Sequence, residues 1–137
     1  MTIKLIPEED QDTKRRKKWI YDATEISLDK DMSINIKYGI LEIQIEDYIH
    51  LPQCCGAYVI TTKSGYLYVG SSRNVRRRIV EHIKQQVTRQ SSSIIEPIEK
   101  IRVYVVETPF DARILEFWLM KELKPRLNAG FIVKNNL

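Results

Sequence analysis

Two short aromatic-glycine motifs, separated by a turn, constrain the fold of this chain more than any other feature. Gly56-Ala57-Tyr58 and Tyr68-Val69-Gly70 each lie in an apolar stretch, and Lys63-Ser64-Gly65 between them has the composition of a tight turn. Apolar runs joined by a glycine-containing turn predict two antiparallel strands, over residues 57–62 and 66–70. Each strand would present a tyrosine next to a glycine, and a glycine allows another group to approach the backbone closely.

A basic amphipathic helix is predicted directly after this hairpin. Asn74 is a favourable N-cap, and the residues up to about Thr88 carry an apolar side chain every four positions, at Val75, Ile79, Ile83 and Val87. Arg78 and His82 are four residues apart, so they would lie on one face of the helix. Two phenols, a guanidinium and an imidazole beside glycines predict a site for a phosphate diester.

The remaining C-terminal part predicts one more strand and one more helix. Alternating apolar residues over 101–105 predict the strand. The segment Thr108-Pro109-Phe110-Asp111 combines a capping hydroxyl, a proline at the first helical position and a carboxylate near the positive end of the helix. This helix should end near Leu123, before Pro125. The expected fold belongs to the α/β (α+β) class and is a small antiparallel three-stranded sheet flanked by helices.

Glu116 is the one carboxylate in an otherwise apolar stretch of this last helix, from Ile114 to Met120. An unpaired carboxylate in such surroundings costs on the order of several kcal/mol, so Glu116 is predicted to have a partner. The partner is either a basic residue of the other helix or a divalent cation. A cation bound by both Glu116 and a substrate phosphate would neutralise the carboxylate and also serve chemistry.

Residues 1–50 are predicted to form an N-terminal extension, for dimerisation or DNA contact, of a domain over residues 51–137. The basic run from Lys14 to Lys18 precedes Trp19-Ile20-Tyr21, and it predicts a short helix within 12–25. The run is either a further contact to a polyanion or a solvated face. Apolar residues alternate with polar ones over 33–49, and the pattern is broken at Tyr38-Gly39, which predicts a β-hairpin.

Positive charge is concentrated around the two tyrosine-glycine motifs. The chain has a net charge of +4, whereas residues 51–95 hold seven basic side chains and one acidic one, Glu81, and residues 1–50 have a net charge of −3. A basic patch of this kind predicts a polyanionic partner, and it overlaps the predicted phosphate diester site. A solvated basic helix face is the alternative.

The composition excludes several other classes. No apolar run approaches the roughly 18 residues of a membrane-spanning helix, and the acidic segment from Met1 to Asp12 has no signal-peptide core. The only cysteines, Cys54 and Cys55, are adjacent, so they predict small apolar side chains in place of a zinc site or a structural disulfide. We expect a cytoplasmic protein with no membrane partner, or one in the host cytoplasm if a phage or mobile element encodes it.

In order and spacing, these residues resemble the signature of the GIY-YIG nuclease family. The resemblance covers about residues 55–129 and includes both tripeptides, Arg78, His82, Glu116 and the segment Leu123-Lys124-Pro125-Arg126-Leu127-Asn128. Ala57 and Val69 stand where the family usually has isoleucine, and both are packing positions. The resemblance implies a DNA endonuclease, of restriction type or of phage or mobile-element type. It would hydrolyse phosphodiester bonds with a single divalent cation, Mg²⁺ or Mn²⁺.

The resemblance also implies a role for each signature residue. Tyr58 would be the general base or would position the water, and a nearby cation would help to form phenolate because the ordinary pKa of tyrosine is about 10. Tyr68 would complete a phenol pair. Arg78 would stabilise the charge of the phosphorane-like state, and His82 would assist proton transfer or donate to the phosphate. Glu116 would hold the metal.

Two further groups of residues complete the implied site. Asn128 would tie the C-terminal segment back to the catalytic residues. DNA would be contacted by side chains in and just before the first helix, namely Ser71, Arg73, Arg76, Arg77 and Lys84. Of these, Arg73, Arg77 and Lys84 are expected to contact phosphates. A homodimer would cut both strands, whereas a monomer would be a structure-specific nicking nuclease. The alternative of another class is a DNA-binding module that keeps the fold without cutting.

Overall fold

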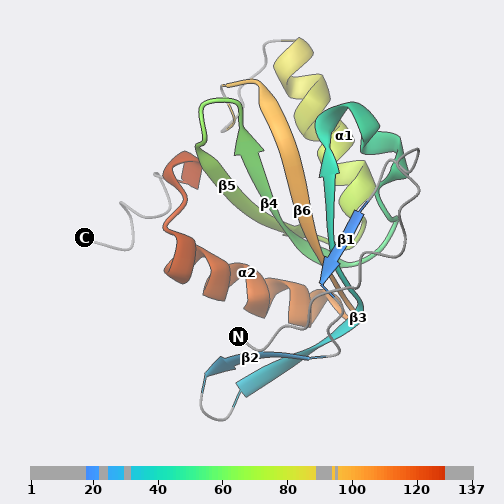
Figure 1. Cartoon of the computed structure of the whole chain (residues 1–137), viewed down its shortest axis with the longest axis vertical. Helices are drawn as coiled ribbons and strands as arrows, with labels where there is room; N and C mark the ends of the chain where they lie inside the picture. The colour runs from blue at the N-terminus through green and yellow to red at the C-terminus, as the bar shows by residue number, and fades with distance from the viewer. Residues whose placement is uncertain (1–17, 22–24, 30–31, 89–93, 95, 129–137) are drawn as a thin grey trace.

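The computed structural model describes residues 18–21, 25–29, 32–88, 94 and 96–128, which form an antiparallel sheet and its helices (Figure 1). The strands are β1 (Lys18–Tyr21), β2 (Glu25–Asp29), β3 (Met32–Gln44), β4 (Gly56–Thr62), β5 (Leu67–Ser72) and β6 (Ile98–Val106). The helices are α1 (Val75–Val87) and α2 (Pro109–Leu123), with two 3-10 helices, η1 (Ile45–His50) and η2 (Arg126–Asn128). The predicted hairpin, third strand and both helices are therefore confirmed, with boundaries shifted by a few residues.

The strands lie in the order β1-β3-β6-β4-β5, and β2 pairs with β3 outside this path. All pairs are antiparallel. In the β4–β5 hairpin Tyr58 is directly opposite Gly70, and Tyr68 is opposite Ile60. Because side chains alternate between the two faces of a strand, both motif tyrosines lie on the same face of the sheet.

The two helices cover opposite faces of the sheet. Alternation along β6 separates two apolar clusters, since Val103 belongs to one and Tyr104 to the other. The α1-side core comprises Leu41, Ile43, Leu51, Tyr58, Ile60, Val75, Ile79, Ile94, Ile98, Ile101, Val103 and Val105. The α2-side core comprises Ile40, Ala57, Val59, Val69, Tyr104, Val106, Ala112, Leu115, Leu119 and Met120. Cys54 packs against the first and Cys55 against the second, as expected of small apolar side chains.

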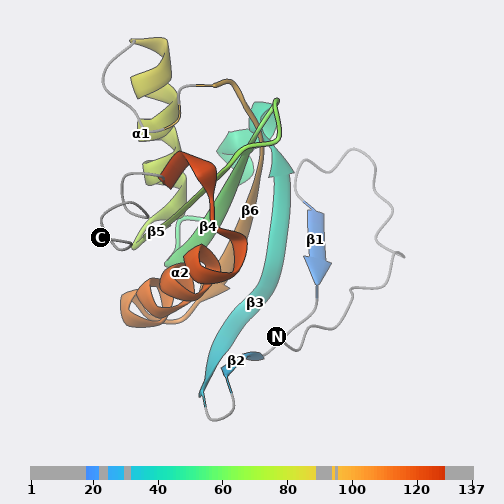
Figure 2. The ribbon, with the colours of Figure 1, turned by 90° about the vertical axis from the view of Figure 1, so that its left-hand side faces the viewer.

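Helix α1 begins where the sequence predicts, because the Asn74 side chain accepts a hydrogen bond of 3.0 Å from the backbone N–H of Arg77. Val75 and Ile79 are fully buried. Val87, the last position of the predicted apolar stripe, is instead 77% exposed, so the stripe is not buried along its whole length. The end of α1 extends past the strands, so its last turn has no sheet to pack against (Figures 1 and 2).

The N-terminal segment forms strands where a helix and a hairpin were expected. Lys18–Tyr21 is strand β1, paired with β3; the other residues of the expected helix, apart from Glu25 in β2, lie outside the described part of the chain. The expected hairpin is replaced by the continuous strand β3, followed by η1. Gly39, with φ of 102°, lies where the β3–β6 register shifts between Ile36 and Ile40. This glycine therefore makes an irregularity within one strand instead of a turn.

The predicted fold class is confirmed, although the sheet extends beyond the three expected strands. β3 pairs along β6 from Ile36–Val106 to Gln44–Lys100. Figure 2 shows β3 running the length of the sheet, with β1 beside it and β2 near its lower end. The domain boundary near residue 50 stays a proposal. In the part of the chain described above, no helix combines the length and apolar character needed to cross a membrane.

Candidate active site

A buried contact between Tyr58 and His82 forms the centre of the site. Tyr58 comes from β4 and His82 from α1, and their side chains are 1% and 2% exposed. The Tyr58 hydroxyl oxygen is 3.0 Å from His82 Nε2. The other ring nitrogen, Nδ1, is buried and has no hydrogen-bond partner among the described residues. One side of the imidazole is thus held by the phenol.

Gly70 makes room for the Tyr58 ring. A Cβ atom at position 70 would lie 2.5 Å from the Tyr58 hydroxyl oxygen and 2.6 Å from Cζ. Neither strand backbone can move away easily, because β4 and β5 are paired across these two residues. The glycine of the second motif is therefore required by the tyrosine of the first, as the expected close approach predicts.

Tyr68 and Arg78 complete this cluster on the α1 side of the sheet. The Tyr68 ring centroid is 6.5 Å from that of Tyr58 and 5.2 Å from that of His82. Arg78, from the first turn of α1, forms an ion pair with Glu81, with Nη1 3.0 Å from Oε2. Glu81 was not among the expected site residues, although its position three residues after Arg78 on a helix is a readable signal.

Burial and charge keep the phenol and imidazole neutral. Burial raises the pKa of Tyr58 above its ordinary value, Tyr68 adds to the shift, and Arg78 opposes it. Burial likewise raises the pKa of Tyr68 against the effect of Arg78. Burial, and after it the charge of Arg78, lowers the pKa of His82 to about 4. At neutral pH the resting contact is therefore one between an uncharged phenol and an uncharged imidazole.

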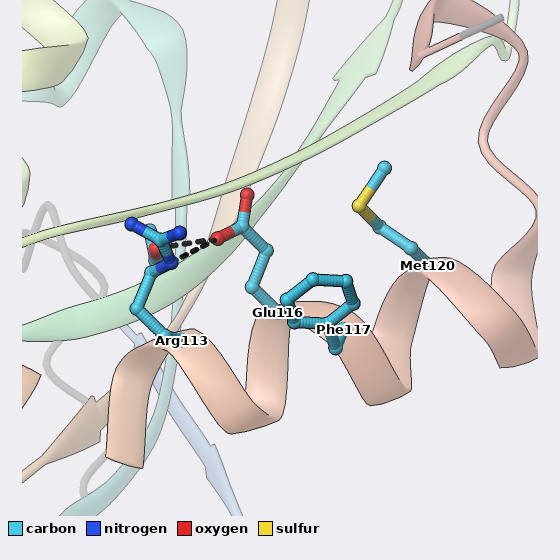
Figure 3. A pocket seen from close by; sticks show the side chains of 5 residues that line it. Arg113, Glu116, Phe117 and Met120 are labelled. Atoms are coloured by element: carbon cyan, nitrogen blue, oxygen red, sulfur yellow. Dashed lines mark hydrogen bonds and ion pairs between the residues drawn. The ribbon is translucent and has the colours of Figure 1, made fainter. Parts of the chain in front are cut away.

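Glu116 approaches the same hairpin from α2, on the opposite face of the sheet. The Ser71 hydroxyl donates a hydrogen bond of 2.6 Å to Glu116 Oε1. Arg113 Nε lies 3.9 Å from the same oxygen, and a dashed line marks this pair in Figure 3. The Glu116 charge contributes to the raised pKa of Tyr58 and Tyr68, so the two halves of the site are electrostatically coupled. The site straddles β5, an edge strand of the sheet, at Gly70 and Ser71.

The expected surroundings of Glu116 need correction. Its side chain is 24% exposed, and Phe117 is 57% exposed, so this apolar stretch of the helix is not buried on all sides. The basic neighbour is Arg113 of the same helix, not a residue of α1. Leu115 and Leu119 carry the buried stripe of α2, and Glu116 lies at its border next to β5.

A metal ion at this position would have a single carboxylate. The described residues contain no group of three or more His, Cys, Asp or Glu side chains that could form a protein cage. Mg²⁺ commonly binds through one or two carboxylates and keeps waters and phosphate oxygens as its other ligands. Glu116, with one oxygen held by Ser71, fits this kind of site.

Asn128 fastens η2 to the middle of β5. Its Oδ1 accepts a hydrogen bond of 2.9 Å from the Val69 N–H, and its Nδ2 donates one of 3.0 Å to the Val69 carbonyl oxygen. Val69 is thereby paired on the edge of the sheet that β4 does not cover. The expected tie between the C-terminal segment and the site is present as a hydrogen-bonded clamp.

The residues expected to contact DNA differ in their surroundings. Arg73, Arg77 and Lys84 are exposed. Arg76 instead donates a hydrogen bond of 2.7 Å from Nε to the Leu51 carbonyl oxygen, and Ser71 is engaged by Glu116. Sequence reasoning missed Arg113 and the Ser71–Glu116 pair. The Ser71–Glu116 pair could have been inferred from the register of the β4–β5 hairpin, because Ser71 lies opposite Ala57 and thus on the α2 side of the hairpin.

The residues of this site fall in a region that matches known proteins in sequence. The family model for a UvrC-like GIY-YIG domain matches residues 54–129. The UvrABC system protein C of Wolbachia sp. subsp. Brugia malayi (strain TRS) is 34% identical over 96 residues, which cover 67% of this chain and 16% of the relative. The protein of the same name from Porphyromonas gingivalis (strain ATCC BAA-308 / W83) is 35% identical over 81 residues, 58% of this chain and 14% of the relative.

A third relative, the UvrABC system protein C of Hydrogenovibrio crunogenus (strain DSM 25203 / XCL-2), is 33% identical over 84 residues, 60% of this chain and 14% of the relative. The chain thus matches between about a seventh and a sixth of the length of these curated relatives. The region that the family model matches contains Tyr58, Tyr68, Arg78, His82 and Glu116. The chain belongs to the GIY-YIG nuclease family, with a domain of the UvrC-like type.

Proposed function

We propose that this chain is a metal-dependent DNA endonuclease that hydrolyses phosphodiester bonds. The observation that carries the proposal is the buried Tyr58–His82 contact, which lies beside Arg78 and is electrostatically coupled to Glu116. The Tyr58 hydroxyl oxygen has a proton acceptor 3.0 Å away at His82 Nε2, and the charge of Arg78 opposes the effect of burial on the pKa of Tyr58, so the phenol has both a base and a cation beside it.

Tyr58 and His82 would act together in moving a proton. The resting phenol is neutral, and the uncharged imidazole can accept at Nε2 the proton that the phenol gives up. Tyr58 would take a proton from the attacking water while its own proton passes to Nε2. Because both protons move together, this route would not require the free phenolate that the resemblance implies.

Arg78 would stabilise the charge that develops on the phosphorus group. Its ion pair with Glu81 is exposed on the surface of α1, with side chains 32% and 50% exposed. Pairs of this kind contribute about 1 kcal/mol or less, so a phosphate can displace Glu81 from the guanidinium. The forked guanidinium then provides two parallel donors to the phosphate oxygens.

Glu116 would hold the divalent cation, Mg²⁺ or Mn²⁺, through the oxygen that Ser71 does not engage. Such a cation supplies polarisation of a phosphoryl oxygen. Arg73, Arg77 and Lys84 would position the DNA by contacts to its phosphates, and we keep Arg76 as a weaker candidate because its Nε is bound to Leu51.

Each chain would carry one site, so a monomer would nick DNA and a homodimer would cut both strands. The relatives bear the name of a UvrABC system protein and not that of a restriction enzyme. We therefore favour a structure-specific nicking nuclease in the cytoplasm over the restriction-type or mobile-element-type homodimer. A non-cleaving DNA-binding module is the second candidate.

Incubation with supercoiled plasmid and Mg²⁺ tests the proposal. We expect nicked circles with the wild type and none after chelation of the metal. Glu116→Gln keeps the size of the side chain and an acceptor for Ser71 but removes the charge, so cleavage should fall by more than about 100-fold while DNA binding persists. Because Glu116 is 24% exposed and its pair with Arg113 is long, the thermal midpoint should change by only a few degrees.

Glu122→Gln is a matched control, since it removes the same charge from an exposed position of α2. It should cut as the wild type does. A Glu116→Gln protein that cuts normally, or one that melts far lower and still cuts, would show that Glu116 has only a structural role. A wild-type protein that shifts DNA in a gel but leaves every plasmid supercoiled would support the non-cleaving module.

A further inference from the structure

A pocket of about 300 Å³ lies next to Glu116, between α2 and the end of β5. Its lining consists of Ser71, Arg113, Glu116, Phe117 and Met120. Figure 3 shows the Arg113 and Glu116 side chains meeting toward the strand, with the Phe117 ring between Glu116 and Met120. The proposed function uses Glu116 and Ser71 but leaves the other three lining residues without a role.

Of these three residues, only Arg113 suits a phosphate. Phe117 and Met120 have no hydrogen-bond donor, and the carboxylate of Glu116 repels an anion in the absence of a cation. An aromatic ring, a thioether and a guanidinium are instead the groups on which a planar heterocycle stacks. Phe117 presents a ring that is 57% exposed, and Arg113 a guanidinium side chain that is 71% exposed.

The size of the pocket limits what it can hold. A volume of about 300 Å³ is at the lower end of the range for small-molecule sites, so it accommodates one base but not a base pair. A base within a duplex has both faces covered by its neighbours, and it must leave the stack to meet Phe117. Glu116 is part of the pocket wall, so such a base would belong to a nucleotide beside the phosphate at the site.

We propose that this pocket binds one unpaired base of the DNA substrate, stacked on Phe117 with Arg113 at its edge. The inference rests on the proposed function for the identity of the substrate, and it adds a reason for selectivity. DNA that is distorted or locally single-stranded would be preferred, because the base is then already out of the stack. Positive charge on Arg113 complements the phosphates that flank such a nucleotide.

Fluorescence of 2-aminopurine tests stacking without cleavage. Two duplexes are compared in the absence of divalent metal, one with 2-aminopurine unpaired in a single-nucleotide bulge and one with it paired. We expect the wild type to quench the bulged probe and to bind it about tenfold more tightly than the paired one. Phe117→Ala should lower this preference to about twofold or less. Loss of a ring on which a base stacks typically weakens binding about tenfold.

Phe110→Ala provides the matched control. Phe110 is a phenylalanine of the same helix, is 72% exposed and does not line the pocket. It should leave the quenching and the preference unchanged. Equal effects of the two substitutions, or none from Phe117→Ala, would overturn the inference. The inference would also be overturned if Phe117→Ala changed the molecular mass measured by sedimentation but left DNA binding unchanged. That result would assign the ring to a protein interface.

The fluorescence test of the pocket and the plasmid assay of the endonuclease can fail independently. A wild type that quenches the bulged probe but cuts no plasmid would refute the proposed endonuclease and leave the base pocket supported. A wild type that cuts plasmid but binds both probes equally, and whose Phe117→Ala variant does the same, would refute the pocket and leave the endonuclease supported.

Discussion

The imidazole of His82 is placed in a setting that makes the stability of the protein depend on pH. It is 2% exposed, and its Nε2 contacts a phenol that is also buried. Burial and Arg78 lower the pKa of His82 from 6.5 to about 4. The unfolded chain therefore binds a proton at this residue at higher pH than the folded chain does, and acid favours unfolding.

We expect the free energy of unfolding to fall as the pH is lowered from about 6.5 to about 4. Above 6.5 neither state is protonated at His82, and below 4 both are, so the loss is confined to this window. The shift corresponds to a contribution on the order of 3 kcal/mol. Urea denaturation at a series of pH values measures it.

His82→Gln separates this contribution from that of the carboxylates. Glutamine can still hydrogen-bond the Tyr58 hydroxyl but does not titrate. The variant should be less stable than the wild type at pH 7, and its stability should decline less between pH 6.5 and 4. Parallel curves for the two proteins would contradict the assignment of a depressed pKa to this residue.

At the scale of secondary structure, the Asn128 clamp stabilises an edge strand. Asn128→Ala removes both hydrogen bonds to Val69 and leaves a backbone N–H and carbonyl partly buried. We expect a loss of about 1–3 kcal/mol in stability. The amide hydrogen of Val69 should exchange faster, by at least the factor that corresponds to the loss in the free energy of unfolding of the whole protein.

Asn128→Asp is the informative partner of this substitution. It retains an acceptor for the Val69 N–H and loses the donor to the carbonyl oxygen. An intermediate loss of stability is therefore expected, with the Val69 amide still protected. If Asn128→Ala were as stable as the wild type, the two hydrogen bonds to Val69 would make no contribution to the stability of the fold.

The elements that could be predicted from the sequence are those with local signals. The Asn74 cap, the Thr108-Pro109 start and the turn between the two motifs each act within a few residues. Strand β3 could not be predicted, because its partner β6 lies about 60 residues away and Gly39 carries the same signal in a turn and in a strand irregularity. The sequence thus indicated a hairpin where the structure has one strand.

The residues of the candidate site also fall into two groups, those that local sequence signals predict and those that depend on tertiary packing. Motif spacing identified Tyr58, Tyr68, Arg78 and His82, and the structure brings these together. Glu116 was identified for a partly mistaken reason, because it lies at the border of the apolar stripe and not within it. The pocket at Phe117 could not be found from sequence, since it depends on how α2 is rotated against β5.

At the scale of the whole molecule, exposed positive charge lies in and just before α1, at Arg73, Arg77 and Lys84, where we propose that DNA binds. Arg77→Ala should reduce the slope of log K against log salt concentration by about one and weaken binding to all DNA sequences similarly. Lys100→Ala removes the same charge from β6 and should change the slope less. If Arg77→Ala altered which sequence is cut and left the slope unchanged, Arg77 would be a base contact.

The clamp between Val69 and Asn128 also has a consequence for how the protein is made. The two residues are 59 positions apart, and ribosomes add about 5–20 residues per second. For about 3–12 s after Val69 is synthesised, the residue that covers its edge does not yet exist. During that interval the nascent hairpin has an open strand edge, which is the kind of surface that recruits neighbouring chains or chaperones. Tyr58, Tyr68 and Arg78 are all translated before Asn128, so the last residue of η2 sets the earliest moment at which the site can be complete.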